Sequence, residues 1–144
     1  MNVWDRRTGD VVQTIFGPKI AGDGIDIKDN FILTAANRGN EQLQLWDWRE
    51  NKTVHNFKWD EEPSDSNAFL FCAQFCKNSP NTLMACGGTQ MKLFSLDDYS
   101  EMVEVKFDQG ESLYSCDSSY SINRYLVGGK HGSMFYLGSN KTFE

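Results

Sequence analysis

The stretch Leu43-Gln44-Leu45-Trp46-Asp47 alternates apolar and polar residues and ends in a Trp-Asp pair. A second Trp-Asp pair ends Asn2-Val3-Trp4-Asp5, and two degraded copies without the pair follow, at Lys92-Leu93-Phe94-Ser95 and Met134-Phe135-Tyr136-Leu137. The aromatic positions of the four segments, Trp4, Trp46, Phe94 and Tyr136, are 42, 48 and 42 residues apart. A nearly fixed period of this length is typical of a repeat fold.

The segments between these anchors have the pattern of β-strands. Residues 31–36 form an apolar run between two turn signals, and residues 53–59 form a more polar alternating run. The same order recurs with predicted strands at 69–76, 83–86, 91–96 and 102–107, and then at 113–116, 125–127 and 133–137. Short strands at regular intervals, bounded by turn residues, predict an all-β fold.

Size and composition restrict the class of protein. The chain has 144 residues, a hydrophobic fraction of 40% and a net charge of −6. Nucleic-acid binding requires a basic surface, so the negative charge argues against that partner. The longest apolar run, residues 68–73, is far shorter than a membrane span, and the start of the chain has no secretory signal pattern. We therefore expect a cytoplasmic protein with no membrane insertion.

Four cysteines occur, at positions 72, 76, 86 and 116. Cys72 and Cys76 lie in one strand-like run, roughly 13 Å apart at the rise of a strand, which is beyond the reach of a disulfide. The sequence has no Cys-x-x-Cys pair and no nearby histidine, so a metal site is not indicated. We expect buried, reduced thiols that act as small apolar residues.

Several of these segments resemble the WD-repeat family of β-propellers. The resemblance is carried by Trp46-Asp47 at the end of a strand, by residues 70–75 with 83–88, and most closely by residues 3–12. It implies blades of four-stranded antiparallel sheets. The Gly-His pair that usually opens such a repeat is absent, so the family's polar tetrad cannot form as a set. Thr34 and Trp46 could supply two of its members.

On this resemblance, the chain is an incomplete ring of about three and a half blades. Residues 1–17 would give the two outer strands of one blade, 18–59 and 60–107 two full blades, and 108–144 a last blade without its outer strand. Three arrangements remain open: a part of a larger propeller, an open array held by neighbours, or a pair of half-propellers in which residues 10–16 of one copy complete the last blade of another. Open strand edges favour association, so we expect homo-oligomers or contacts with other subunits.

The expected function is that of a non-catalytic scaffold for protein–protein interaction, with no cofactor, no metal and no catalytic residue. In the family, loops on the top face often bind partners, and the candidates there are Trp59, Arg38, Lys130, His131, Asp60 and Glu61. Trp59 could instead pack under its own loop, and Arg38 could be a solvated turn residue. The segment 128–132 resembles a phosphate loop only superficially, because it lacks the P-loop spacing. The alternatives are a structural component of a cytoskeletal or ciliary complex, or an enzyme subunit built on a propeller.

Overall fold

The computed structural model describes residues 1–59, 69–108, 110–121 and 123–138. Within these ranges the chain is made of β-strands and one short 3-10 turn. The strands are β1 (Asn2–Asp5), β2 (Asp10–Thr14), β3 (Ile20–Lys28), β4 (Phe31–Ala36), β5 (Leu43–Asp47), β6 (Lys52–Phe57), β7 (Leu70–Phe75), β8 (Thr82–Gly87), β9 (Gln90–Ser95), β10 (Glu101–Lys106), β11 (Leu113–Ser118), β12 (Arg124–Gly129) and β13 (Met134–Gly138), with η1 at Lys130–Gly132. The prediction of an all-β fold is confirmed.

The strands form one large sheet and two small ones. The large sheet is mixed and curled, and its order is β10-β9-β8-β7-β3-β4-β5-β6. It consists of two antiparallel meanders, β3–β6 and β7–β10, which join where Asp23 of β3 pairs in parallel with Cys72 of β7. The hairpin β1–β2 and the antiparallel sheet β11–β13 are separate.

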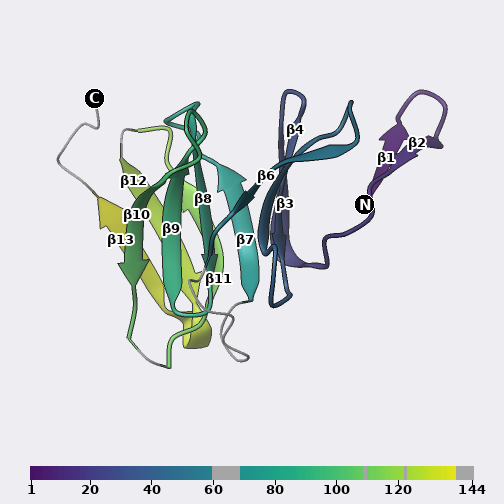
Figure 1. The fold of residues 1–144 in the computed structure, drawn as a ribbon. Coiled ribbons are helices and arrows are strands. Elements are labelled where there is room, and N and C mark those ends of the chain that lie inside the picture. Colours follow the sequence, from purple (N-terminus) through teal and green to yellow (C-terminus); the bar gives the residue numbers. More distant parts are fainter. Residues whose placement is uncertain (60–68, 109, 122, 139–144) are drawn as a thin grey trace.

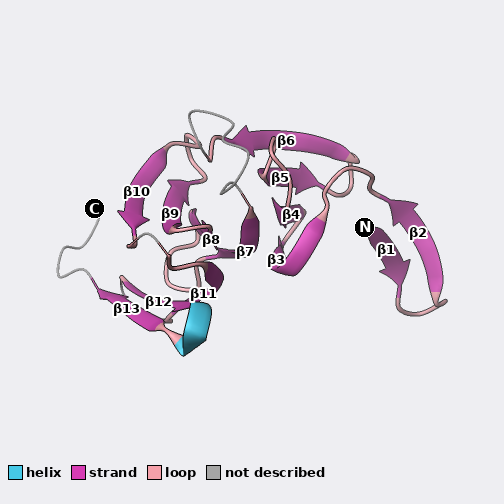
Figure 2. Cartoon of the chain, turned by 90° about the horizontal axis from the view of Figure 1, so that it is seen from below, coloured by secondary structure: helices cyan, strands magenta, loops and turns pink. Residues whose placement is uncertain are grey.

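The sheets lie side by side along an arc, as the view from below shows (Figure 2); Figure 1 shows the same sheets from the side. The hairpin β1–β2 is at one end, the two meanders are in the middle, and β11–β13 is at the other end. Seen from below, β3, β7 and β11 lie close to one another, and the later strands of each group lie further out (Figure 2). The first strands of the two meanders and of the last sheet therefore lie around a common centre.

The apolar runs of the sequence set the strand positions. The strands predicted at 31–36 and 43–47 coincide with β4 and β5. The other predicted strands shift or extend by a few residues at their ends, where turn residues such as Gly129 still pair in the ladder.

At the end of β8, a Cβ added to Gly87 would lie 2.2 Å from the Phe69 carbonyl oxygen. Only glycine allows this close approach of two strands.

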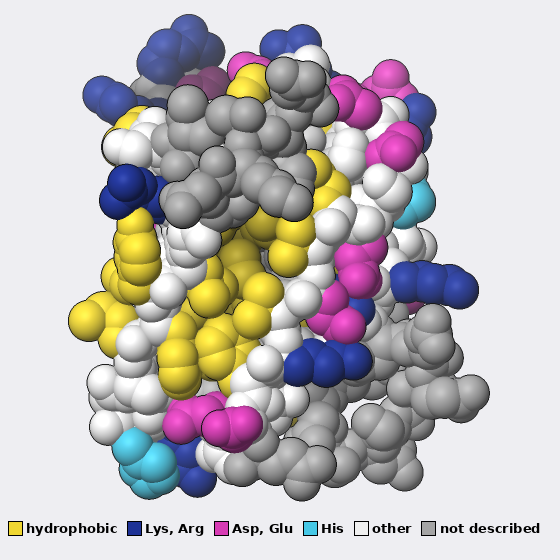
Figure 3. All heavy atoms as spheres, turned by 90° about the vertical axis from the view of Figure 1, so that its left-hand side faces the viewer, with side chains coloured by type: hydrophobic (Ala, Val, Ile, Leu, Met, Phe, Trp, Pro, Cys, Tyr) yellow, Lys and Arg dark blue, Asp and Glu magenta, His cyan; other side chains and the backbone are white. Residues whose placement is uncertain are grey.

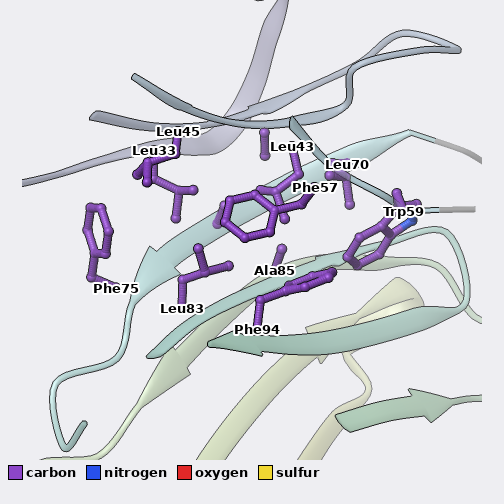
Figure 4. Close-up of a cluster of buried hydrophobic side chains, with 12 residues drawn as sticks. Leu33, Leu43, Leu45, Phe57, Trp59, Leu70, Phe75, Leu83, Ala85 and Phe94 are labelled. Atoms are coloured by element: carbon purple, nitrogen blue, oxygen red, sulfur yellow. The ribbon is translucent and has the colours of Figure 1, made fainter. Parts of the chain in front are cut away.

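Three apolar clusters hold neighbouring sheets together. The first, between β3–β6 and β7–β10, is built on residues such as Leu33, Leu43, Phe57 and Phe94 (Figure 4). The second lies between β7–β10 and β11–β13 and includes Cys72, Cys76, Cys86 and Cys116, all buried as expected.

The third cluster joins the N-terminal hairpin to the large sheet through Ile15, Ile32 and Trp46. Within it, the indole Nε1 of Trp46 donates a hydrogen bond of 3.0 Å to Thr34 Oγ1, and both side chains are buried. The two residues named for the polar tetrad of the WD-repeat family are therefore hydrogen-bonded to each other. The bond satisfies a polar group that would otherwise be costly to bury.

Candidate interaction surfaces

The topology brings the described members of the predicted binding set, Arg38, Trp59, Lys130 and His131, to one end of the array, here called the turn end. β3 and β7 run parallel, so the start of each, the β4–β5 turn and the end of β6 share this end. The start of β11 joins them, because Leu113 N donates to Gly88 O and Lys130 N donates to Ser112 O. Figure 2 is viewed from this end.

Arg38, in the β4–β5 turn, is fixed by hydrogen bonds inside the chain. Its guanidinium donates to the carbonyl of Gly17 at 3.1 Å, to the carbonyl and carboxylate of Glu41, and to Gln44 Oε1 at 2.7 Å. Gln44 in turn donates to Asn56 Oδ1 at 2.7 Å. Arg38 thus ties the entry to β3 to strands β5 and β6, which differs from the expectation of a solvated turn residue.

Trp59 follows β6 and belongs to the first core cluster. It is 2% exposed, and its ring lies 6.5 Å from that of Phe94 (Figure 4). Among the described residues, its indole Nε1 has no hydrogen-bond partner. A side chain this deeply buried holds two halves of the sheet together, so replacing it with alanine would test stability rather than binding.

The remaining predicted residues have different environments. Lys130 and His131 are exposed in the turn between β12 and β13, where His131 has a positive φ of 58°. Asp60 and Glu61 lie outside the described residues. Of the predicted residues that the structure describes, Lys130 and His131 are the exposed ones, and their role in protein binding stays a prediction.

A groove of about 810 Å³ lies between β6 and the outer strands β9 and β10. At its floor is Lys92, whose ammonium pairs with Glu101 at 2.8 Å and Glu104 at 3.2 Å and lies 5.5 Å from the centre of the Trp59 ring. Partial burial opposes the positive charge, but hydrogen bonds that the ammonium donates to both carboxylates raise the pKa of Lys92. The rim carries His55 stacked on Tyr99 at 4.3 Å.

Sequence reasoning missed Lys92. The available signal was a lysine within the otherwise apolar anchor Met91-Lys92-Leu93-Phe94. Because Lys92 is 7% exposed, its charge needs partners, and two partly exposed carboxylates supply them from the neighbouring strand β10, nine and twelve residues further along the chain. The Lys92 ammonium already has two carboxylate partners, so it is not free to pair with an anionic ligand.

The outer face of the sheet β11–β13 is apolar and exposed. Leu126 is 40% exposed, Met134 69% and Tyr136 62%. Arg124 Nη1 donates to Tyr136 Oη at 2.8 Å, which orients the ring. A hollow of about 250 Å³ opens beside this face, lined in part by Leu126, Met134 and Cys116. A sheet face of this kind normally packs against another layer.

The edge of β13 is also open, since no strand pairs with it within the described ranges. Between this edge and β10, hydrophobic side chains gather in a hollow (Figure 3). Val103, Val105 and Phe107 contribute from β10 and its end, and Phe135 and Leu137 from β13, with Phe107 and Phe135 rings 4.5 Å apart. An unpaired strand beside an apolar hollow is a site where an extended segment could pair.

The opposite end of the array is apolar too. In and beside the hairpin β1–β2, Trp4 is 59% exposed, Val12 60% and Phe16 83%. This hairpin contains only two strands, and it contacts the large sheet through Ile15 and the half-buried Met1 and Val3. Both ends of the array therefore carry hydrophobic side chains that the described part of the chain leaves uncovered.

The described residues were also compared with the requirements of a metal site and of a membrane-spanning helix. In the described part of the chain, no group of three or more His, Cys, Asp or Glu residues has the geometry of a metal site. Within the same residues, no helix is long and apolar enough to cross a membrane.

Comparison with known proteins found no protein-family model and no curated protein that matches this chain.

Proposed function

We propose that the chain is a non-catalytic scaffold for protein–protein interaction, built of WD-type propeller blades that are part of a larger assembly. The recurrent anchors support this. Trp46 and Phe94 each lie in the third strand of a four-stranded meander, β5 and β9. Trp4 and Tyr136 lie in β1 and β13, so the hairpin and the last sheet correspond to shorter copies of the same unit.

The observation that carries the proposal is the apolar surface at both ends of the array. Monomeric proteins seldom expose large contiguous hydrophobic patches, and such patches mark interaction sites. A neighbouring sheet, supplied by further blades, by another subunit or by a second copy, would cover them. Pairing at the β13 edge would add main-chain hydrogen bonds to this contact.

The test combines association in solution with a matched control. The double variant Met134→Lys/Tyr136→Lys places charge on the end face, whereas Met102→Lys changes an exposed methionine on β10, away from that face. Sedimentation velocity at rising protein concentration should show self-association of the wild type, reduced in the double variant and kept in the control. Far-ultraviolet circular dichroism confirms that each variant is folded.

Cross-linking in the native cell tests for other partners. Lys130, exposed near the end face, should give cross-links to another polypeptide or to further propeller sequence. A chain that remains monomeric at all concentrations and yields only internal cross-links would overturn the proposal.

A further inference from the structure

The groove between β6 and the outer strands β9 and β10 has two chemically different ends. Near the β9–β10 turn it is lined by His55, Tyr99 and Glu101, and near the turn end it is lined by Lys58 and Lys106. Glu101 and Lys106 are the first and last residues of β10, so they are about 17 Å apart at the rise of a strand. One end of the groove therefore combines aromatic rings with a carboxylate, whereas the other end is basic.

Tyr99 has a backbone conformation that a bulky residue rarely adopts. Its φ is 61°, and it is the last residue of the turn that the hydrogen bond from Ser95 N to Ser100 O closes at 2.9 Å. The equivalent residues of the β1–β2 and β5–β6 turns are Gly9 and Asn51, with φ of 76° and 52°. Glycine and asparagine tolerate this region, whereas tyrosine does not do so readily. The turn itself therefore gives no reason for a tyrosine at this position.

The contacts of the Tyr99 ring supply such a reason. The ring is stacked on the His55 imidazole, with the ring centres 4.3 Å apart and the planes at 10°. Phe57 lies at an angle to both rings, 4.8 Å from His55 and 5.9 Å from Tyr99. His55 and Tyr99 are half-buried and both line the groove. The two rings therefore form a supported aromatic surface that is contributed by both meanders of the large sheet.

The carboxylate beside these rings keeps part of its capacity to accept hydrogen bonds. The Glu101 side chain is 39% exposed, and its Oε2 accepts a hydrogen bond of 2.8 Å from Lys92, while its Oε1 accepts none within the described residues. Glu104 pairs with Lys92 through one oxygen and with Lys106 through the other. Because Glu104 shares the charge of Lys92 and holds Lys106, Glu101 is the carboxylate that can accept from a group outside the chain.

We propose that this end of the groove binds an arginine side chain of a partner protein. The guanidinium stacks on the aromatic surface of Tyr99 and His55 and donates to Glu101. Arginine fits better than lysine, because its planar and weakly hydrated guanidinium stacks on aromatic faces and donates in a fork that matches a carboxylate. Lys58 and Lys106 repel a cation from the other end, which fixes where the arginine lies.

This binding surface is separate from the apolar ends of the array. The inference therefore goes beyond the proposed association and does not depend on it. If the arginine site fails its test, the sedimentation result for the end faces is unaffected, and a chain that does not self-associate could still bind arginine.

The experiment uses the whole folded chain and N-acetyl-arginine-amide as the probe. In two-dimensional ¹H–¹⁵N NMR spectra, the titration should shift the backbone amides of Tyr99, Ser100, Glu101 and His55 and leave those of β11–β13 unchanged. N-acetyl-lysine-amide at the same ionic strength should bind at least about tenfold more weakly, because it cannot stack or donate in a fork. N-acetyl-glutamate-amide should not bind at this end.

Two variants separate binding from folding. Glu101→Gln keeps the shape of the side chain and removes its charge, and it should weaken binding of the arginine probe by about tenfold or more. Tyr99→Asn gives the turn the residue that stands at the equivalent position 51, so the turn is kept while the stacking surface is lost. Urea unfolding shows whether each variant is folded, and a folded Tyr99→Asn should no longer bind the probe.

Glu50→Gln is the matched control, because Glu50 is also an exposed glutamate paired with a lysine, Lys52, but does not line the groove. It should bind the arginine probe as the wild type does. Equal affinity for the arginine and lysine probes, preference for the glutamate probe, no shift at these residues, or unchanged binding in Tyr99→Asn would each overturn the proposal.

Discussion

Replacing Trp59 with alanine should destabilise the chain strongly, although Trp59 lies beyond the end of β6. The side chain is 2% exposed and packs between the two meanders of the large sheet. A buried tryptophan removes roughly 150–250 Å² from water, and at about 25 cal/mol per Å² this corresponds to about 4–6 kcal/mol as an upper bound. Large-to-small substitutions in cores cost about 3–5 kcal/mol, so we expect a loss of about 4 kcal/mol.

Urea unfolding followed by circular dichroism measures this loss from the midpoint and slope of the transition. The control is Trp4→Ala, because Trp4 has the same side chain but is 59% exposed, and its effect should stay within about 1 kcal/mol. If Trp59→Ala has no folded baseline, Trp59→Leu, which keeps part of the packing, gives an intermediate loss. A loss below about 1 kcal/mol for Trp59→Ala, or equal losses at the two tryptophans, would refute the assignment of Trp59 to the core.

Two smaller effects follow from polar contacts. Thr34→Val removes the hydroxyl that the buried Trp46 Nε1 contacts at 3.0 Å, which should lower the free energy of unfolding by about 1–3 kcal/mol. In the Trp46→Phe background the same substitution should cost about 1 kcal/mol less. Additive losses of the two substitutions in urea unfolding would contradict the hydrogen bond. Partial burial raises the pKa of Glu104, but hydrogen bonds from Lys106 and Lys92 outweigh it and lower the pKa. The stabilisation of the folded state by this carboxylate is therefore fully present above its unfolded-state pKa of about 4.3 and is lost as the pH falls below that value. Glu104→Gln should therefore reduce the difference in urea midpoint between pH 7 and acidic pH, by less than about 1 kcal/mol given its partial exposure, and an unchanged difference would count against the contact.

The strands could be predicted from the sequence because their signals are local. The run Phe31–Ala36 and the alternation of Leu43–Asp47 define β4 and β5 without reference to any distant residue. Arg38 and Lys92 could not be assigned in this way. The partners of Arg38 include Gly17, 21 residues earlier, and Lys92 contacts the ring of Trp59, which follows β6. Such contacts depend on how sheets pack, which periodicity does not encode.

Comparison of the two Trp-Asp pairs shows which property the motif determines, the strand, and which property depends on neighbouring strands, the burial of the tryptophan. Trp4 and Trp46 close strands of similar sequence, yet Trp4 is 59% exposed and Trp46 is 8% exposed. Trp46 lies in β5, between β4 and β6, where β4 supplies Thr34 as its hydrogen-bond partner. Trp4 lies in β1, which pairs only with β2 within the described residues. The motif therefore specifies a strand, whereas burial of its tryptophan requires the inner strands of the same sheet. If an assembly supplies those strands, Trp4 should acquire the environment of Trp46, and its fluorescence should shift to shorter wavelength on association.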